Sequence, residues 1–362
     1  MKLCRVHIQN FKRISDLEVS LLESDEDIPC FRHVFTGDNG SGKTTVLQAI
    51  ALVLSLATRR TNRIEWFNWH GFLPERIGTR GPTRIELEVE LDPDEIKATR
   101  EAFEVWHHVH ELPHMVPPGS ASRVLLVYEN GQVSSPDGPE ARFQLLGRYY
   151  VRKSVTALPA VRELFSRIGD VFWFDQYRNL GLGLTPYAQD TESSDRQRRQ
   201  TWSVGVGELR EFLGRWWAFH LSSSKGHGRD YVESIATAFA RVFPGTTVIG
   251  PVPSDTTGAS VPEFYFLLER DGLRFDISEM SSGEQSLFPL VCDAVQLNIR
   301  KSVVLIDELE LHLHPPEQQS LLAHLPGICP DSQFLLTSHS EHVVDGFPAE
   351  RLTRLEGGRP CL

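Results

Sequence analysis

The sequence has few of the features that mark membrane, secreted or filamentous proteins. Its longest apolar stretch, Ala49 to Ala57, is interrupted by Ser55 and is far shorter than the roughly 20 residues that a membrane-spanning helix needs. The opening segment MKLCRVHIQN contains no apolar core of the kind found in signal peptides. The five cysteines are odd in number and scattered, which argues against a disulfide framework. These absences predict a protein of the reducing cytoplasm, without a membrane partner.

Positive charge and repeated patterns are also scarce. The chain has 37 Lys and Arg against 48 Asp and Glu, so its formal net charge is −11. This balance argues against a surface covered in nucleic-acid-binding charge, although a local basic face leaves room for a nucleic-acid partner. No heptad run or internal repeat is visible, which excludes a long coiled coil. With 40% hydrophobic and 23% charged residues in 362, the composition is that of a globular protein of about two domains.

A glycine-rich loop is the strongest local signal in the chain. It follows an apolar run from Cys30 to Thr36 and precedes a segment, Thr44 to Ala57, whose apolar residues have helical spacing. The loop matches G-x-x-x-x-G-K-[ST], in which backbone N–H groups turn toward a β-phosphate and the lysine reaches the β and γ oxygens. A glycine turn that merely contains Lys-Thr is the alternative. We predict that ATP is bound by Gly37, Asp38, Asn39, Gly40, Ser41, Gly42, Lys43, Thr44 and Thr45.

A short apolar strand that ends in two carboxylates supplies the second half of such a site. Val303 to Ile306 is typical of a strand buried on both faces of a parallel sheet, and Asp307 and Glu308 follow it. Asp307 is placed to join Thr44 as a ligand of Mg²⁺, and Glu308 to polarise the water that attacks the γ-phosphate. A helix N-cap is the alternative for an isolated Asp-Glu pair.

Three further segments resemble the ABC-class ATPases of the OLD, RecF and SMC-like branch. MSSGEQ, from Met280 to Gln285, is similar to the ABC signature loop. DELELHLHP, from Asp307 to Pro315, is similar to that branch's sequence after the second carboxylate motif, with Leu309 where proline is usual. LLTSHS, from Leu335 to Ser340, is similar to its switch segment. With the glycine-rich loop, four motifs stand in the order that this branch shows.

The resemblance implies a fold and further site residues. The fold is an α/β P-loop NTPase of ABC-ATPase type, with a mixed central sheet, an antiparallel β patch and a helical lobe. Ser281 and Gly283 would contact the γ-phosphate of ATP held by a second protomer, and His339 would sense the γ-phosphate. Gln176, after an aromatic run, is the candidate Q-loop glutamine for Mg²⁺ and the attacking water; a surface turn is the alternative.

The segment before the glycine-rich loop adds two basic candidates. IQNFKR, from Ile8 to Arg13, is similar to the N-F-[RK]-S segment of the branch, whose basic residues lie near the nucleotide. The resemblance therefore implies that Lys12 and Arg13 contact the nucleotide, although Arg13 stands where serine is usual.

The order of the sequence patterns predicts three stretches of domain structure. Residues 1–178 form lobe I with the P-loop, a β insertion and the Q-loop; residues 179–300 form a helical lobe II with a mobile loop at 186–200 and the signature; residues 301–362 return to lobe I. Strands are expected at 3–9, 84–91, 123–128, 142–151, 263–268, 273–277, 303–306 and 333–337, and helices at 44–57, 95–112, 206–221, 230–242, 281–300 and 318–325.

Two other patterns carry less weight. His110-Glu111-Leu112-Pro113-His114 fits the zinc motif H-E-x-x-H, but Pro113 would break the helical turn that must bring both histidines to one face. We therefore interpret it as a coincidence. Arg59, Arg60 and Arg63, interleaved with Trp66, Phe67 and Trp69, form either a nucleic-acid or partner surface or a solvated face beside an aromatic core.

The resemblance implies an ATP-hydrolysing switch. Two heads, or a higher oligomer, would enclose Mg²⁺ and ATP, and hydrolysis would be relayed to a separate effector, a nuclease or toxin, as in bacterial anti-phage systems. The stretch from Ser340 to Leu362 is too short for the Toprim nuclease that some OLD proteins carry there. The alternatives are a RecF-like DNA-binding repair ATPase and a scaffold that holds ATP without useful turnover.

Overall fold

The computed structural model describes residues 1–23, 26–67, 69, 71–111, 115–174, 202–222, 231–253, 264–311 and 313–356. The chain divides into two compact units. Unit 1 consists of Met1–Gln176, Ile299–Leu311 and Cys329–Leu362, and unit 2 consists of Tyr177–Asn298 and His312–Ile328. The expected loop at 186–200 lies outside the described residues, as does Gln176.

A five-stranded parallel sheet forms one layer of unit 1. Its strands stand in the order β13 (Leu352–Leu355), β3 (Arg32–Gly37), β12 (Gln333–Thr337), β11 (Val303–Ile306) and β7 (Val171–Phe174). Every residue of β11 and β12 is buried, as expected of strands covered on both faces. Because the strands are parallel, the segments that follow β3, β11 and β12 all leave the sheet at the same edge.

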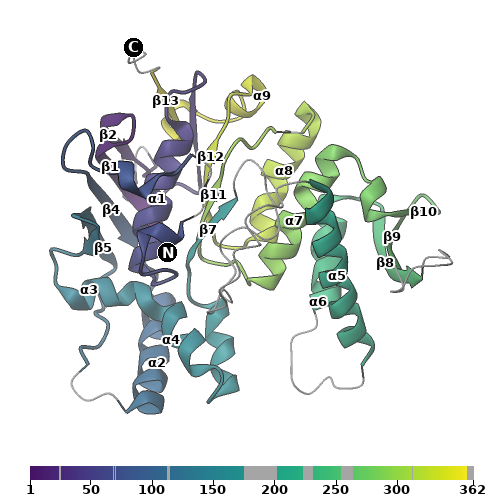
Figure 1. Ribbon diagram of the computed structural model, residues 1–362, viewed down its shortest axis with the longest axis horizontal. Helices are drawn as coiled ribbons and strands as arrows, with labels where there is room; N and C mark the ends of the chain where they lie inside the picture. Colours follow the sequence, from purple (N-terminus) through teal and green to yellow (C-terminus); the bar gives the residue numbers. More distant parts are fainter. Residues whose placement is uncertain are drawn as a thin grey trace. The chain divides into compact units, whose positions relative to one another are not determined.

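A five-stranded antiparallel sheet forms the other layer of unit 1. Its order is β2 (Ile14–Ser20), β1 (Lys2–Phe11), β4 (Arg84–Glu90), β5 (Arg123–Glu129) and β6 (Gln132–Ser134). Helix α1 (Lys43–Ala57) contacts strands of both sheets (Figure 1). Every residue of α1 except Thr44 is buried, which explains why its sequence is apolar nearly all round.

The expected strand at 142–151 is wrong. The segment is α3 (Pro139–Phe143), the 3₁₀ turn η3 (Gln144–Leu146) and α4 (Gly147–Ser154). Its apolar residues have helical spacing, and Leu146 and Tyr150 are buried in one cluster with Phe103 and Trp106 of α2 (Pro93–His110). The β-branched and aromatic content suggested a strand, but packing against α2 decides the structure.

The short remaining elements of unit 1 are the 3₁₀ helices η1 (Ile64–Trp66), η2 (Pro74–Arg76), η4 (Pro159–Ser166) and η7 (Ala349–Arg351), with α9 (Glu341–Val344). Helix α2 ends at His110, because Glu111 adopts a left-handed backbone with φ of 48°. Leu112, Pro113 and His114 lie outside the described residues. His110 is therefore the last residue of α2, and the interpretation of the zinc motif as a coincidence stays a prediction.

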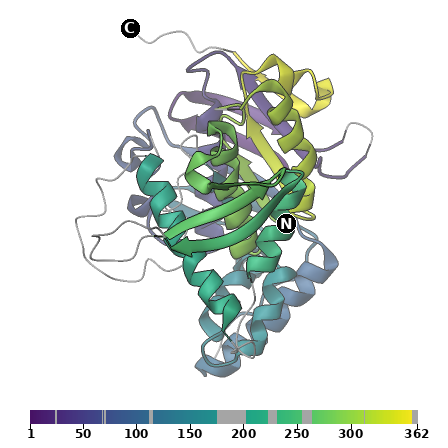
Figure 2. The same ribbon diagram turned by 90° about the vertical axis from the view of Figure 1, so that its right-hand side faces the viewer.

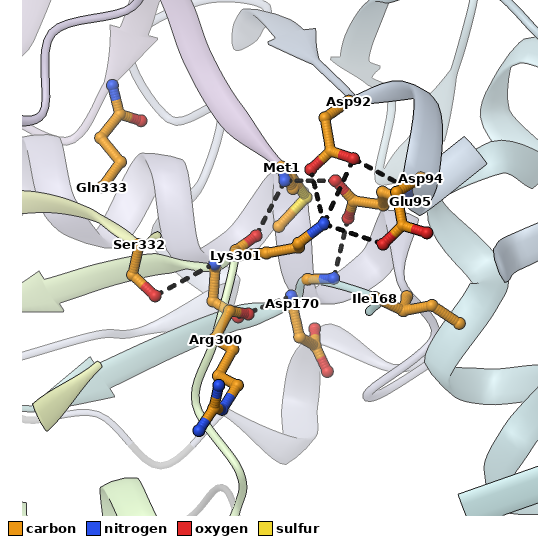
Figure 3. Close-up of polar contacts among 12 residues, drawn as sticks. Met1, Asp92, Asp94, Glu95, Ile168, Asp170, Arg300, Lys301, Ser332 and Gln333 are labelled. Atoms are coloured by element: carbon orange, nitrogen blue, oxygen red, sulfur yellow. Dashed lines mark hydrogen bonds and ion pairs between the residues drawn. The ribbon is translucent and has the colours of Figure 1, made fainter. Parts of the chain in front are cut away.

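Buried polar contacts join distant segments of unit 1. The Met1 ammonium forms an ion pair with Glu95, which is 2% exposed, and donates a 2.8 Å hydrogen bond to the carbonyl of Lys301 (Figure 3). Gln333 of β12 accepts a hydrogen bond from the N–H of Leu3 at 2.7 Å and donates one to its carbonyl at 2.9 Å. These contacts fix β1 against the segments that enter β11 and β12.

The described residues of unit 2 form four helices and a small sheet. The helices are α5 (Trp202–Leu221), α6 (Tyr231–Val242), α7 (Ser282–Gln296) and α8 (Pro315–Ile328), and the 3₁₀ turn η6 (Ile277–Glu279) precedes α7. The sheet is antiparallel, and its strands stand in the order β10 (Leu273–Asp276), β9 (Phe264–Arg270) and β8 (Thr246–Pro253). Figure 2 shows this sheet toward the viewer.

The expected α/β class, with parallel and antiparallel strands and a helical part, is confirmed. The parallel strands form one sheet and the antiparallel strands form the two others. Among the helices that the structure describes, none combines the length and the apolar character required to span a bilayer.

Candidate nucleotide-binding site

The glycine-rich loop connects β3 to α1 and has the backbone that a phosphate cradle requires. Gly37, Gly40 and Gly42 all adopt positive φ, at 144°, 78° and 105°. The first N–H groups of α1 point toward the loop, as they do at the N-terminus of any helix. The N-cap residue, Gly42, has no side chain that could accept a hydrogen bond from them. Backbone N–H groups at a helix N-terminus attract anions, which fits the phosphates of ATP.

Lys43 lies across this loop. Its Nζ donates hydrogen bonds to the carbonyl oxygens of Gly37 at 2.9 Å and Asp38 at 3.0 Å. Burial lowers the pKa of Lys43, while nearby carboxylates, Glu308 foremost, act in the opposite direction. The lysine is thus held at the loop by two backbone carbonyls, and its contact with the phosphates stays a prediction.

Thr44 and Asp307 meet although they are far apart in sequence. The Thr44 hydroxyl lies 3.0 Å from Oδ1 and 2.9 Å from Oδ2 of Asp307, whose side chain is buried at the end of β11. A hydroxyl and a carboxylate that converge in this way are hard oxygen donors of the type that Mg²⁺ prefers. The residues present therefore fit a magnesium ion.

Glu308 follows Asp307 in an unusual backbone conformation. Its φ is 46°, in the left-handed region, and its N–H donates a 2.7 Å hydrogen bond to Oγ1 of Thr337. The Thr337 hydroxyl in turn donates to Oδ1 of Asp307 at 2.6 Å. The sequence reasoning gave Thr337 no role. Thr337 could have been found as a hydroxyl residue at the end of the strand that neighbours β11. The sequence alone does not reveal that β12 is that neighbour.

His339 lies beside two glutamates of the same edge. Its Nε2 is 3.9 Å from Oε1 of Glu308 and 3.7 Å from Oε1 of Glu310, and its backbone N–H donates to Oε1 of Glu310 at 2.6 Å. Oε2 of Glu310 is buried without a hydrogen-bond partner in the part of the chain that the structure describes. Glu310, too, was missed as a site residue.

The two basic candidates before the loop behave differently. Arg13 donates from Nη1 to the carbonyl of Gly40 at 2.9 Å, so its guanidinium rests on the P-loop. Lys12 donates from Nζ to Oε1 of Gln48 at 2.6 Å and to the carbonyl of Gly71 at 2.8 Å, and burial lowers its pKa. Lys12 is therefore engaged with α1 and a neighbouring loop, whereas Arg13 contacts the loop itself.

The remaining candidates are placed as follows. Gln176 lies outside the described residues, but β7, which precedes it, ends at Phe174, whose carbonyl accepts the N–H of Asp307 at 2.9 Å. Asn39 is exposed on the loop, and Thr45 is buried in the first turn of α1. In unit 2, Ser281 is the N-cap of α7 and Gly283 lies in its first turn. The roles of these residues stay predictions.

Aromatic residues near Arg60 form a core rather than an open surface. Phe67 and Trp69 are buried, and Trp69 stacks on Trp173 with centroids 5.6 Å apart and an interplanar angle of 23°. Arg60 is itself buried, with its guanidinium close to the carboxylate of Asp170. Of the two interpretations of this segment, the aromatic core agrees with the structure for these residues.

Comparisons with known proteins agree with a nucleotide site. Residues 186–345 match a family model described as "AAA domain, putative AbiEii toxin, Type IV TA system", and residues 1–105 match one described as "AAA ATPase domain". The chain is 20% identical to "Retron Vc95 probable ATPase" of Vibrio cholerae serotype O1 biovar El Tor, over 97% of this chain and 73% of that protein.

Another relative and a solved structure are also similar to the chain. The chain is 22% identical to "Septu protein PtuA" of Bacillus mycoides (strain KBAB4) over 93% of its own length, and it spans only 38% of that protein. Among solved structures, the SMC head domain from Thermotoga maritima aligns with 98% of this chain and 94% of its own, at 14% identity and a TM-score of 0.44.

Proposed function

We propose that this chain, an ATPase of the AAA type, binds Mg²⁺ and ATP at the P-loop, closes as a dimer around the nucleotide and uses hydrolysis to control a partner effector. The observation that carries the proposal is the convergence of the Thr44 hydroxyl on both oxygens of Asp307, with Glu308 next in the chain. Three neighbouring parallel strands supply these groups and His339 at one edge of a sheet.

The proposal gives each candidate residue a task. The loop N–H groups and Lys43 bind the phosphates, while Thr44 and Asp307, with Gln176, hold the metal. A magnesium ion held there would supply charge that neutralises the phosphate oxygens. Glu308 accepts a proton from the attacking water, and His339 contacts the γ-phosphate, which ties the switch segment to the state of the nucleotide.

The dimer is supported by the position of the signature residues. Ser281 is exposed at the N-terminus of α7, where the helix dipole favours an anion. We assign Ser281 and Gly283 to the γ-phosphate held by a second copy. That arrangement would make closure depend on ATP and opening depend on hydrolysis.

The partner is assigned by similarity. The retron and Septu relatives support a role in a defence-associated system. We assign the effector role in that system to a separate nuclease or toxin. The ATPase would then release or restrain that effector according to its nucleotide state.

The molar mass in solution tests this proposal directly. It is measured for the wild type and for Glu308→Gln, each with and without Mg²⁺ and ATP, alongside ATP hydrolysis. We expect ATP to double the mass transiently in the wild type and persistently in Glu308→Gln, whose hydrolysis falls at least about a hundredfold. Lys43→Ala should neither bind ATP nor dimerise, and Glu163→Gln, an exposed glutamate of η4, serves as the control.

Other outcomes would redirect the proposal. A molar mass that does not change when ATP is added would contradict the proposed dimer and the roles of Ser281 and Gly283. Hydrolysis that rises with the length of added duplex DNA, and falls steeply with salt, would favour the RecF-like repair ATPase instead. If Glu308→Gln controls the effector as the wild type does, a scaffold that holds ATP without useful turnover is favoured.

A further inference from the structure

One residue, Thr337, contacts three consecutive residues at the end of β11. Its hydroxyl donates to Oδ1 of Asp307 at 2.6 Å and accepts the N–H of Glu308 at 2.7 Å. Its carbonyl oxygen accepts the N–H of Leu309 at 3.0 Å. Thr337 is fully buried, so water does not compete for these bonds. One side chain and its own backbone therefore fix the carboxylate of Asp307 and the chain direction at the next two residues.

The segment that Thr337 holds needs such support. Glu308 has a left-handed backbone, which disfavours a residue with a Cβ and persists where the surroundings over-determine it. The regular pairing of β11 with β12 ends at Ile306 and Leu336. Beyond this point the two hydrogen bonds from Glu308 and Leu309 to Thr337 continue the connection between the strands. The direction of the Glu308 side chain thus depends on Thr337.

We propose that Thr337 is a positioning residue for hydrolysis, which orients Asp307 through its hydroxyl hydrogen and Glu308 through its hydroxyl oxygen. This inference rests on the proposed function, because it assumes that Asp307 holds the metal and Glu308 activates water. It assigns the same hydroxyl to both tasks, so that losing it disturbs the metal ligand and the general base together. Mutation of groups that orient metal ligands in this way commonly lowers metal affinity or activity by about 10- to 100-fold.

The test compares three variants. Thr337→Val keeps the size and the β-branch but removes the hydroxyl, and Thr337→Ser keeps the hydroxyl. Thr353→Val removes a hydroxyl from β13 of the same sheet, where Thr353 contacts His33 rather than the site. For each variant we would measure kcat and KM for ATP hydrolysis, ATP binding without metal, and the Mn²⁺ concentration that half-activates hydrolysis. Thermal unfolding checks that each variant folds.

We expect Thr337→Val to lower kcat about 10- to 100-fold and to raise the half-activating Mn²⁺ concentration about tenfold, with metal-free ATP binding within about threefold of wild type. Thr337→Ser should stay within about threefold of wild type in all three. If Thr337→Val does not fold, the same comparison is made with Thr337→Cys, which leaves a poor donor in a similar volume.

The outcomes separate this inference from the proposed function. If the wild type hydrolyses ATP and Glu308→Gln does not, while Thr337→Val behaves as wild type, then Thr337 has no positioning role. If Thr337→Ser is as impaired as Thr337→Val, the effect comes from packing and the inference is wrong. If the wild type and Glu308→Gln hydrolyse ATP at the same rate, the proposed function itself fails.

Discussion

The carbonyl oxygen of Leu355 occupies the space into which a side chain on Gly37 would project. The two residues are partners in the parallel pairing of β13 with β3, and Gly37 has a φ of 144°. A Cβ at this position would also approach the hydroxyl oxygen of Ser41. The first glycine of the P-loop is therefore required for strand pairing as well as for the turn.

Gly37→Ala should destabilise the protein by about 2 kcal/mol or more and weaken ATP binding at least about tenfold, because backbone must move to admit the methyl group. Chemical denaturation and ATP titration measure the two effects. Gly272→Ala is the matched control, since Gly272 also has positive φ, at 76°, but open space around it. Equal losses in both variants would show that backbone conformation alone sets the cost.

Arg13→Ala should mainly weaken ATP binding, whereas Lys12→Met should mainly lower the stability of the folded protein. Arg13 rests on the carbonyl of Gly40, so its removal should weaken ATP binding about fivefold at low salt and less at high salt. Lys12 bonds to Gln48 and Gly71, so Lys12→Met should cost about 1–2 kcal/mol of unfolding free energy with ATP affinity within about twofold. ATP titration and denaturant unfolding measure the two effects. If Lys12→Met weakens ATP binding and leaves the unfolding free energy unchanged, Lys12 contacts the nucleotide instead.

His33 should make stability depend on pH below neutrality. It is buried in β3 beside Oγ1 of Thr353 at 2.8 Å, and burial lowers its pKa from 6.5 to about 4. Because the folded-state pKa is the lower one, the unfolded chain binds the proton more readily, and stability falls as pH drops from about 6.5 to 4. The unfolding free energy of wild type relative to His33→Gln should fall by about 3 kcal/mol across this window. A difference that does not change with pH would contradict the assignment.

Asp170→Asn should destabilise unit 1 by about 3 kcal/mol, because it leaves the buried guanidinium of Arg60 and the partly buried one of Arg152 without this carboxylate. Oδ2 of Asp170 lies 3.9 Å from Nε of Arg60 and 3.6 Å from Nη1 of Arg152, and Asp170 is 1% exposed. Denaturant unfolding measures the loss, with the exposed Asp137→Asn as control. A loss below about 0.5 kcal/mol would show that the arginines are satisfied by other groups.

Ser281 variants should separate helix capping from the proposed phosphate contact. The Ser281 side chain accepts the N–H of Glu284 at 3.3 Å, and Glu284 accepts the N–H of Ser281 at 2.9 Å. Ser281→Asp and Ser281→Asn keep an N-cap, whereas Ser281→Ala should cost about 1 kcal/mol. We expect Ser281→Asp alone to abolish ATP-dependent dimerisation while it stays folded, because its charge opposes a phosphate. Wild-type dimerisation of Ser281→Asp, read from molar mass, would remove the trans role.

The sequence predicted those parts of the molecule that contiguous residues determine. The spacing of glycines before Lys43 and the apolar run before Asp307 each contain their own strand, turn or helix signal. The α/β class followed from these signals and is confirmed. A site residue was predicted wherever its role lies in a local pattern, and the structure brings Thr44 and Asp307 within 3.0 Å of each other.

What could not be predicted depends on which strands become neighbours. Thr337 and Glu310 enter the site only because β12 lies beside β11, and no local pattern contains that order. Leu355 constrains Gly37 through a pairing between the two ends of the chain. For the segment 142–151, local preference favoured a strand, and burial of Tyr150 against α2 stabilised a helix instead.

The order of strands in the parallel sheet also bears on how the chain folds during synthesis. Strand β3 precedes both of its neighbours in the described sheet, β12 and β13, by a long stretch of chain. Until β12 and β13 leave the ribosome, β3 has two open edges of the kind that invite association with other chains. The nascent protein therefore carries an unpaired strand while the residues between β3 and β12 are synthesised.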